Sequence, residues 1–516
     1  MLVSIVKCAI LFQYCSAFKI LLVFPIPYRS HAILGESFVR HLLKAGHEVT
    51  YITPYLIPQD HRNLNQIELQ TKGYLDKAVT IENVLKEEIN NAELFNVLMK
   101  LANLTLLNEN VVKLLNDKNI QFDVAVIERM FLDVYCGFSA VFNCPYVSFF
   151  PYHDDLNIFE VMHETPNPAY TANIGTGNIP PFSFYQRVQE LFFHMIYKTM
   201  KAYYITPKEE EFYNIMFKPF TNRRGRDLPK YDDVKHNASL ALSTSHSSIG
   251  NSYLQPFSLV LIGGFHIDNV LDPLPKGLKK IMDSSNGVIL FSTGSQLTSE
   301  GMPKEMKTHI MRVFSNLNYT VLWKATMQEE SLPENVNIAS WLPQQSILGH
   351  PKCVLFITHG GILSVTEAVH FGVPIIGIPM FGDQFVNIRT AVKNGIGKEV
   401  KLSINLSDTL EKTINEVLSN PRYRERAKEM SRIYHSRMVP PGVELVHWIE
   451  EVVTSRGAPH LRSRALSMPL YQKYYLDFIA TILVLLIALV YILRTMFNII
   501  VSKSSQMKKR TLKKTK

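Results

Sequence analysis

The chain has 516 residues, of which 47% are hydrophobic and 19% are charged, with a formal net charge of +9. One hydrophobic core rarely grows beyond about 250 to 300 residues, so two or more domains are expected and a single small module is excluded. The composition is too apolar for a disordered chain, and its apolar excess predicts membrane segments. Seven of the net charges lie between Lys503 and the C-terminus, so the pI of 9.0 gives no support to nucleic-acid binding.

Residues 1–17 have the pattern of a cleaved signal peptide. Lys7 precedes an apolar run, and small residues follow at Ser16 and Ala17, where a signal peptidase would cut. A first buried strand is the alternative, but the better strand candidate, KILLVFP from Lys19, begins after the cut. Two of the five cysteines would leave with the signal, and the remaining three cannot make a disulfide framework.

From Lys19 onward, short apolar runs alternate with turns and amphipathic stretches. KILLVFP predicts a strand, AILGESFVRHLLKAG a helix that ends on Gly46, and HEVTYIT the next strand, which together form a β-α-β unit. FDVAVIE and CPYVSFF continue the pattern, before an irregular section over residues 151–181 and helical stretches to about Phe220. We expect an N-terminal domain over residues 18–255.

A second series of the same kind begins after SLVLIGGFHI. GVILFSTGS, YTVLWKA, VNIASWLP, CVLFITHGG and VPIIGIPM are strand-like runs, most of them separated by helix-length segments. The expected fold class is α/β, with two doubly wound Rossmann-like domains that face a cleft and bind ligand at the carboxyl ends of their strands. The second domain is expected over residues 256–430, followed by helices over residues 431–474 that pack back.

An apolar run that begins at Asp477, DFIATILVLLIALVYILRTMFNIIV, is long enough to cross a bilayer, for which about 20 residues suffice. We predict a transmembrane helix over residues 477–497 and a cytoplasmic tail over 498–516, because basic residues favour the cytoplasmic side. The body would then be lumenal, as in a single-pass type I protein. The terminal KKTK resembles the dilysine address of the endoplasmic reticulum membrane, with a plain stop-transfer run as the alternative.

Four Asn-x-Ser/Thr sequons fit a lumenal body. Taken singly, each is weak evidence, because the tripeptide is common by chance. They predict glycosylation at Asn103, Asn237, Asn318 and Asn405.

The stretch FITHGGILSVTEAVHFGVPIIGIPMFGDQFVN, residues 356–387, combines several features of a nucleotide site. A strand that ends in His359 and two glycines and then opens a helix presents free backbone N–H groups and a positive dipole end to a phosphate. Glu367 lies further along this helix, where its carboxylate can accept hydrogen bonds from a ribose. Asp383 and Gln384 follow the next strand at the same sheet edge. Each feature alone is common, and the spacing of all of them is specific.

At these offsets the stretch resembles the donor-binding signature of the UDP-glycosyltransferase family, the membrane-bound glucuronosyl- and glucosyltransferases. SWLPQQSILGHP, FSTGS, HWIEEVV, GAPHLR and the apolar span with its basic tail resemble the family as well, and the likeness is weakest over residues 151–220. The resemblance implies a GT-B type fold, in which residues 18–255 bind the acceptor and residues 256–430 bind the UDP-sugar donor, with no further cofactor. One position differs: Leu363 stands where vertebrate members usually carry Asn, as it does in arthropod members.

The resemblance also implies which residues hold the donor. UDP would be bound by Ser295, Trp341, Gln344, His359, Gly361, Ser364 and Glu367. The hydroxyls of the donor sugar would be bound by Asp383 and Gln384. Within the first set, Trp341 is implied to stack near the uracil, Glu367 to bind the ribose and His359 to face the diphosphate.

Sugar transfer with inversion needs a base that takes the proton of the attacking hydroxyl, and a neutral histidine suits this task. His31 follows the first predicted strand at the edge that faces the cleft, and its place matches the general base of the family. Most of the 17 histidines are expected to be structural or solvated. A carboxylate would orient the imidazole. The family carries Asp at the offset of Glu128, so Glu128 is one candidate and Asp133 is the reserve.

The expected reaction is inverting transfer of a hexose from a UDP-sugar to a hydroxyl of a small lipophilic acceptor. Leu363 favours glucose as the sugar, with glucuronic acid as the other possibility. Transfer to a membrane lipid would use the same site, and a membrane-tethered binder without turnover is the alternative from another class. No metal is expected, because clustered ligands are missing from the sequence and a helix N-terminus can stabilise the leaving diphosphate. Whether the chain forms a homo-oligomer is left open by the sequence.

Overall fold

The structure of the chain is a computed structural model with two compact units, Met1–Arg462 and Ser463–Lys516. The signal-peptide prediction concerns a segment of which only Ala17 lies within the described residues. The structure describes residues 17–58, 60–76, 80–86, 91–130, 132–153, 156–162, 167–250, 255–268, 270–294, 301–326, 332–463, 465 and 468–514.

Seven parallel strands form the first sheet, in the order β3-β2-β1-β4-β5-β6-β7. In β1, Ile20 and Leu22 belong to one core cluster, and Leu21 and Val23 to another. Because successive side chains of a strand point to opposite faces, an unbroken apolar run is what a sheet covered on both faces requires. The strands are β1 Lys19–Val23, β2 Glu48–Thr53, β3 Leu64–Glu68, β4 Val124–Glu128, β5 Tyr146–Phe150, β6 Leu240–Ser243 and β7 Leu259–Leu261.

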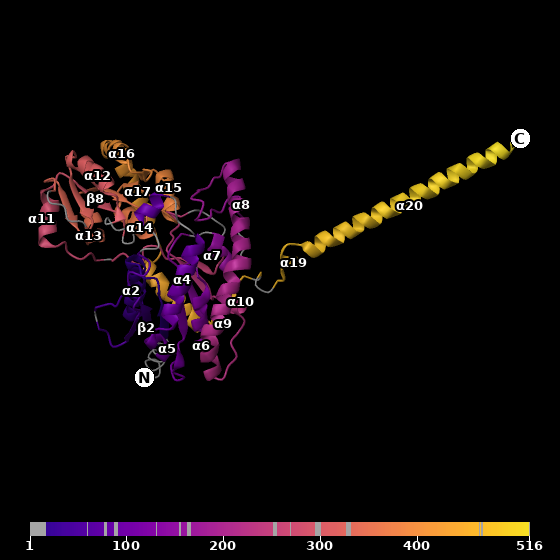
Figure 1. The fold of residues 1–516 in the computed structure, drawn as a ribbon, viewed down its shortest axis with the longest axis horizontal. Coiled ribbons are helices and arrows are strands. Elements are labelled where there is room, and N and C mark those ends of the chain that lie inside the picture. Colours follow the sequence, from indigo (N-terminus) through magenta and orange to yellow (C-terminus); the bar gives the residue numbers. More distant parts are fainter. Residues whose placement is uncertain are drawn as a thin grey trace, which may run out of the picture. The chain divides into compact units, whose positions relative to one another are not determined.

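The helices of this first domain are coloured indigo to magenta in Figure 1. A π-helical turn, η2 Lys201–Ile205, joins two long helices, of which the first begins at a capping box between Ser183 and Gln186. The helices are α2 Arg29–Lys44, α3 Ile81–Leu85, α4 Asn91–Leu106, α5 Glu109–Asn116, η1 Val134–Cys136, α6 Gly137–Phe142, α7 Leu156–Val161, α8 Phe184–Met200, α9 Thr206–Arg223 and α10 Tyr231–Lys235.

Six parallel strands form the second sheet, in the order β10-β9-β8-β11-β12-β13. The strands are β8 Val288–Ser292, β9 Thr320–Lys324, β10 Val336–Ala339, β11 Cys353–Thr358, β12 Ile375–Gly377 and β13 Gly397–Glu399. The helices of this domain are α11 Lys276–Ser284, α12 Lys304–Ser315, α13 Gln344–Leu348, α14 Ile362–Phe371, α15 Gln384–Lys393, α16 Ser407–Ser419 and α17 Pro421–His435.

After α17 the chain returns to the first domain. Helix α17 packs against α14, and its Tyr434 belongs to the core of the second sheet. The next helix, α18 Pro441–Thr454, packs instead against α2, β4 and β5. Its Leu445 and Ile449 are fully buried in the core of the first sheet. The chain therefore crosses between the two domains twice.

Both sheets reverse their strand order at one point, where β1 lies beside β4 and β8 lies beside β11. At such a point the loops that follow two adjacent strands diverge and leave a crevice at the carboxyl ends of the strands. His31 follows β1, Glu128 ends β4, and His359 follows β11. The predicted fold class, with two doubly wound parallel sheets, is confirmed.

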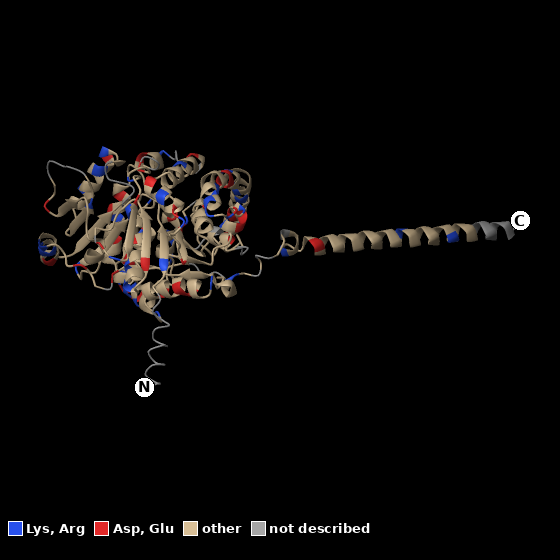
Figure 2. Ribbon diagram, turned by 90° about the horizontal axis from the view of Figure 1, so that it is seen from below, with Lys and Arg blue, Asp and Glu red and all other residues tan. Residues whose placement is uncertain are grey.

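The second unit contains α19 Leu470–Lys473 and α20 Leu476–Lys514. The part of α20 from Leu476 to Met507 is long and apolar enough to cross a membrane, and it includes the predicted span of residues 477–497. Figure 2 shows that charged residues are sparse along the described part of this helix, whereas they are frequent along the ribbon of the first unit.

Candidate active site

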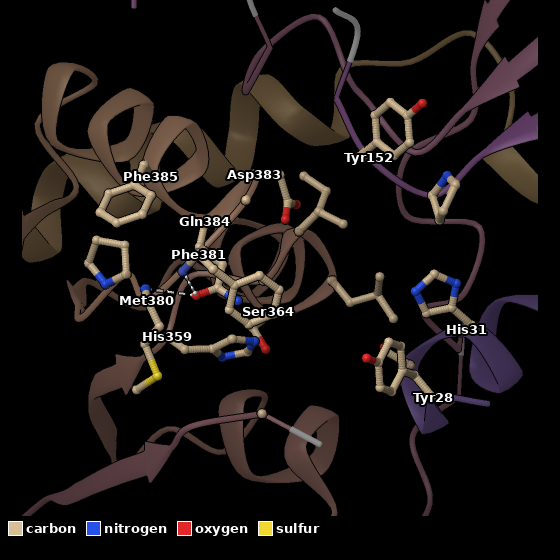
Figure 3. Close-up of a pocket in the computed structure, with 18 of the residues that line it drawn as sticks. Tyr28, His31, Tyr152, His359, Ser364, Met380, Phe381, Asp383, Gln384 and Phe385 are labelled. Carbon is tan, nitrogen blue, oxygen red and sulfur yellow. Dashed lines mark hydrogen bonds between the residues drawn. The ribbon is translucent and has the colours of Figure 1, made fainter. Parts of the chain in front are cut away.

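A cavity of about 1370 Å³ lies at the carboxyl ends of both sheets, lined by residues of both domains. Figure 3 shows His31 and Tyr28 on one side of it and His359, Ser364 and Asp383 on the other. The site residues predicted from the sequence that line this cavity are His31, Trp341, Gln344, His359, Gly361, Ser364, Glu367, Asp383 and Gln384. Ser295 lies outside the described residues.

His31 and Glu128 form a buried pair at the switch point of the first sheet. His31 lies in the first turn of α2 and Glu128 is the last residue of β4, a neighbour of β1. The His31 Nδ1 and Glu128 Oε1 atoms are 2.5 Å apart, and the two residues are 7% and 1% exposed. A carboxylate can only accept, so Nδ1 is the donor in this contact and Nε2 is the ring nitrogen that does not contact Glu128. His31 itself lines the cavity.

Asp133, the other candidate carboxylate, is engaged elsewhere. Arg129 Nε donates a hydrogen bond to Asp133 Oδ1 at 3.0 Å, and Lys201 Nζ lies 3.6 Å from Oδ2. Burial alone would raise the pKa of Asp133, but Arg129, Lys201 and Lys235 hold that pKa well below its ordinary value. The structure thus brings Glu128 to His31, and it places Asp133 in a buried ion-pair network.

The ring of His359, in the turn after β11, lies between Gly361 of the same turn and Gly294, which follows β8. A Cβ atom at Gly361 would lie 2.7 Å from His359 Nε2, and a Cβ atom at Gly294 would lie 2.5 Å from His359 Cε1, so a side chain at either position would displace the ring. Burial, with a smaller effect of Lys324, lowers the pKa of His359 to about 4. The imidazole is therefore neutral at pH 7, next to the N-terminus of α14.

The carboxylate of Glu367 is held from two sides. Gln344 Nε2 donates to Glu367 Oε2 at 2.6 Å and to Ser364 Oγ at 3.1 Å, and Gln345 Nε2 donates to Glu367 Oε1 at 3.2 Å. His266 Nε2 lies 3.4 Å from Oε1. Sequence reasoning missed Gln345 and His266 as parts of this site. Gln345 directly follows Gln344 in the motif, and His266 follows β7 in SLVLIGGFHI, a stretch that served only to mark the start of the second series.

Lys324, the last residue of β9, is a further site residue that sequence reasoning missed. Its Nζ atom lies 4.1 Å from the ring centroid of Trp341, which is 53% exposed. Burial lowers the pKa of Lys324 to about 8, and the charge of Glu367 opposes this shift. The only sequence signal was a cation at the carboxyl end of a strand in the second domain.

The loop before α15 is braced by side chains of α15 itself. Gln384 Oε1 accepts hydrogen bonds from the backbone N–H groups of Met380 and Phe381 at 2.9 and 3.3 Å, drawn as dashed lines in Figure 3. Asn387 Nδ2 donates to Asp383 Oδ2 at 2.8 Å and to the carbonyl oxygen of Gly360 at 2.9 Å. Burial raises the pKa of Asp383 to about 6. Asp383 and Gln384 both line the cavity.

The four sequons lie in different surroundings. Asn237, Asn318 and Asn405 are exposed, and the side chain of Asn237 accepts a hydrogen bond from Arg462. Asn103 is partly buried in α4. Among the described residues, no group of three or more His, Cys, Asp and Glu side chains is placed to hold a metal ion.

Two doubly wound domains around one cleft define the GT-B fold of glycosyltransferases. A solved structure titled as the glycotransferase of kitacinnamycin has this arrangement, with a TM-score of 0.58 and 17% identity over 85% of this chain and all of that chain. The chain belongs to the UDP-glycosyltransferase family, because the family model described as "UDP-glucoronosyl and UDP-glucosyl transferase" matches residues 19–511.

Two relatives show how widely this similarity extends. UDP-glucosyltransferase 2 of Dactylopius coccus is 29% identical over 97% of this chain and 98% of its own length. UDP-glucuronosyltransferase 2C1 of Oryctolagus cuniculus is 26% identical over 90% of this chain and 94% of its own length. The chain is thus a glycosyltransferase that transfers a sugar from a UDP-sugar.

Proposed function

We propose that the protein transfers a hexose, with inversion, from a UDP-sugar to a hydroxyl group of a small lipophilic acceptor, and that His31 is the general base. The observation that carries this proposal is the 2.5 Å contact between His31 Nδ1 and Glu128 Oε1 at the wall of the shared cavity. It leaves the second ring nitrogen free for the acceptor.

In the proposed reaction the acceptor oxygen attacks the anomeric carbon while its proton passes to His31 Nε2. The bond between that carbon and the diphosphate oxygen breaks on the opposite side, so the configuration inverts and UDP leaves. Glu128 stabilises the imidazolium that forms, as a buried carboxylate does in a serine-hydrolase triad. The N-terminus of α14, the neutral His359 and the cation of Lys324 would stabilise the charge on the leaving diphosphate.

The acceptor side of the cavity is apolar. Its lining in the first domain includes Leu94, Phe95, Leu98, Phe193 and Ile196. Such a wall suits a lipophilic molecule that presents one hydroxyl group to His31.

Glucose is the proposed sugar. Asp383 and Gln384 line the cavity and offer one carboxylate and one amide to sugar hydroxyls. A glucuronate carboxylate would be bound best by a bidentate guanidinium, and no arginine is among the described residues that line the cavity. Leu363 lines the cavity as well and packs against the core of the first sheet, and its apolar side chain offers the donor no hydrogen bond.

The proposed location is the endoplasmic reticulum membrane, with α20 as a single span, the catalytic domains in the lumen and the basic tail in the cytoplasm. The length and apolar composition of α20 support this location. We also propose turnover without a metal ion: activity should persist in excess EDTA, and loss of activity that only added metal restores would contradict this.

The experiment that tests the reaction compares the parent chain with His31→Ala. UDP-glucose and UDP-glucuronate are offered side by side with a panel of phenols, and the glycoside is identified by mass and its anomer by NMR. We expect His31→Ala to lose at least about 10³-fold in kcat while UDP affinity by calorimetry stays within about twofold. His61→Ala, at an exposed histidine, is the control. Unchanged transfer by His31→Ala would overturn the assignment of the base.

A further inference from the structure

Helix α8 carries an apolar face that points to solvent. At about 100° per residue, the exposed positions fall on one continuous side of the helix. Phe184 and Tyr185 are each 75% exposed and Phe192 is 65% exposed. The large apolar side chains of this face are Phe184, Tyr185, Val188, Leu191, Phe192, Met195 and Ile196.

This face is unusual within the first unit. Among the other described helices of Met1–Arg462, each carries at most one exposed large apolar side chain, which is normal for a folded protein. A stripe along a 17-residue helix is different, because contiguous exposed apolar surface marks a site of contact with a protein or a membrane. Figure 1 shows α8 at the outer edge of its domain.

The opposite side of α8 faces the interior. Phe193, Tyr197 and Met200 line the cavity that holds His31, and Ile196, at the border of the exposed face, lines it as well. Glu190 and His194 are buried on the same side, and Glu190 Oε2 accepts a hydrogen bond from the backbone N–H of Asn173. A single helix therefore separates the acceptor side of the cavity from the exposed apolar face.

The covalent path of the chain indicates what covers this face. The first unit ends at Arg462, whose guanidinium donates to the side-chain and main-chain oxygens of Asn237. Asn237 follows α10, which packs on α9, the continuation of α8 through η2. The apolar α20 begins at Leu476, so residues 463–475 reach at most about 45 Å at about 3.5 Å per residue. This tether limits the distance between Arg462 and any bilayer that α20 spans to the same reach.

We propose that the outward face of α8 lies in the surface of this bilayer, and that lipophilic acceptors enter the cavity from the lipid along this helix. The proposal rests on the membrane span of the proposed function. A helix with one apolar face, aromatic residues at one end and a cation at its border has the composition of an interfacial helix. Arg187 provides this cation, and its guanidinium lies 5.8 Å from the ring centroid of Phe184.

The first test measures the depth of α8 in the full chain, reconstituted in vesicles of phosphatidylcholine and phosphatidylserine. A thiol-reactive fluorophore is placed by Phe192→Cys, by Glu211→Cys on the exposed side of α9, or by Leu486→Cys in α20, with the parent chain as the blank for native thiols. We expect spin-labelled lipid to quench the Phe192 site, and iodide to quench it about fivefold less than the Glu211 site.

Equal quenching of the Phe192 and Glu211 sites by iodide would overturn the proposal, because the face would then be free in water. Protection of the Phe192 site from both quenchers would also overturn it, and would show that a second copy of the chain covers the face. A Leu486 site that lipid does not quench would instead contradict the membrane span. None of these readouts depends on sugar transfer, so failure of the membrane proposal can be told apart from failure of the proposed reaction.

The second test measures access. The triple variant Leu191→Gln, Phe192→Gln, Met195→Gln changes only side chains outside the cavity lining, and a triple variant at the exposed Glu210, Glu211 and Asn214 of α9 is the matched control. In vesicles we expect the first variant to raise KM about tenfold for an acceptor that partitions into lipid, and to leave kcat and the KM of a water-soluble phenol unchanged. If the variant has the same KM as the parent for the acceptor that partitions into lipid, as it does for the water-soluble phenol, entry from the lipid is overturned.

Discussion

Replacing Glu128 by Gln removes one charge from the buried pair with little change of shape. The His31 and Glu128 side chains are 9% and 0% exposed, so water screens their interaction weakly. Two unit charges about 4 Å apart interact by about 4 kcal/mol at an effective dielectric constant of about 20. This attraction exists only when His31 is protonated, that is, as the acceptor proton is transferred. The amide of the Glu128→Gln variant keeps a hydrogen bond to the ring, so we expect about 2 to 4 kcal/mol to be lost from the transition state.

This free energy corresponds to a loss of about 30-fold to 10³-fold in kcat, since about 1.4 kcal/mol is a factor of ten. Single-turnover transfer to a phenol measures the chemical step, and calorimetry with UDP checks that the donor site is intact. Asp133→Asn is the matched control, because Asp133 belongs to the network of Arg129 and Lys201. We expect Asp133→Asn to lower the Tm and to leave kcat close to that of the parent. A Glu128→Gln enzyme within about threefold of the parent kcat would refute the role of Glu128.

Three further predictions concern charged groups. Arg129→Met leaves Asp133, whose side chain is only 12% exposed, poorly compensated, so we expect a loss of about 3 kcal/mol in urea unfolding, and a loss below about 1 kcal/mol would contradict this. Burial raises the pKa of Asp383 to about 6, so the stability that this group contributes at low pH is lost as pH rises through 6. Asp383→Asn should therefore gain up to about 3 kcal/mol on the parent between pH 4 and 7, and a constant difference would count against this. Burial lowers the pKa of Lys324 to about 8, so Lys324 loses its charge between pH 7 and 9.5. UDP affinity by calorimetry should therefore fall about fivefold over this range in the parent but not in Lys324→Arg. A parallel fall in both proteins would exclude Lys324 as the cause.

The fold could be predicted where the apolar runs are long and buried on both faces. The runs around β1, β2, β4, β5 and β8 to β12 all contain strands. Four strands were missed: β3 has the mixed sequence LNQIE at the sheet edge, and β6, β7 and β13 have only four, three and three residues. The π-helical turn η2 was missed as well, because its sequence, KAYYI, has no distinctive pattern.

The candidate site could be predicted where residues follow strands, and less well where distant segments meet. Strand ends and motif spacing were sufficient to select His31 and the residues around the second sheet. The choice between Glu128 and Asp133 was not possible from local sequence, because Asp133 is bound by Lys201 and its backbone N–H donates to Glu209 Oε1. Both partners come from a helical region that lies much further along the chain. The catalytic and binding roles themselves stay predictions.

The double crossing between the domains limits how hybrids of this enzyme with its relatives should be built. Because Leu445 and Ile449 of α18 belong to the core of the first sheet, a single splice between β7 and β8 would give the acceptor half a foreign α18. Such a hybrid would replace the native packing of α18 on α2 and lose stability. Acceptor preference should therefore be exchanged with two splices, one before β8 and one between His435 and Pro441, so that α18 travels with its own sheet.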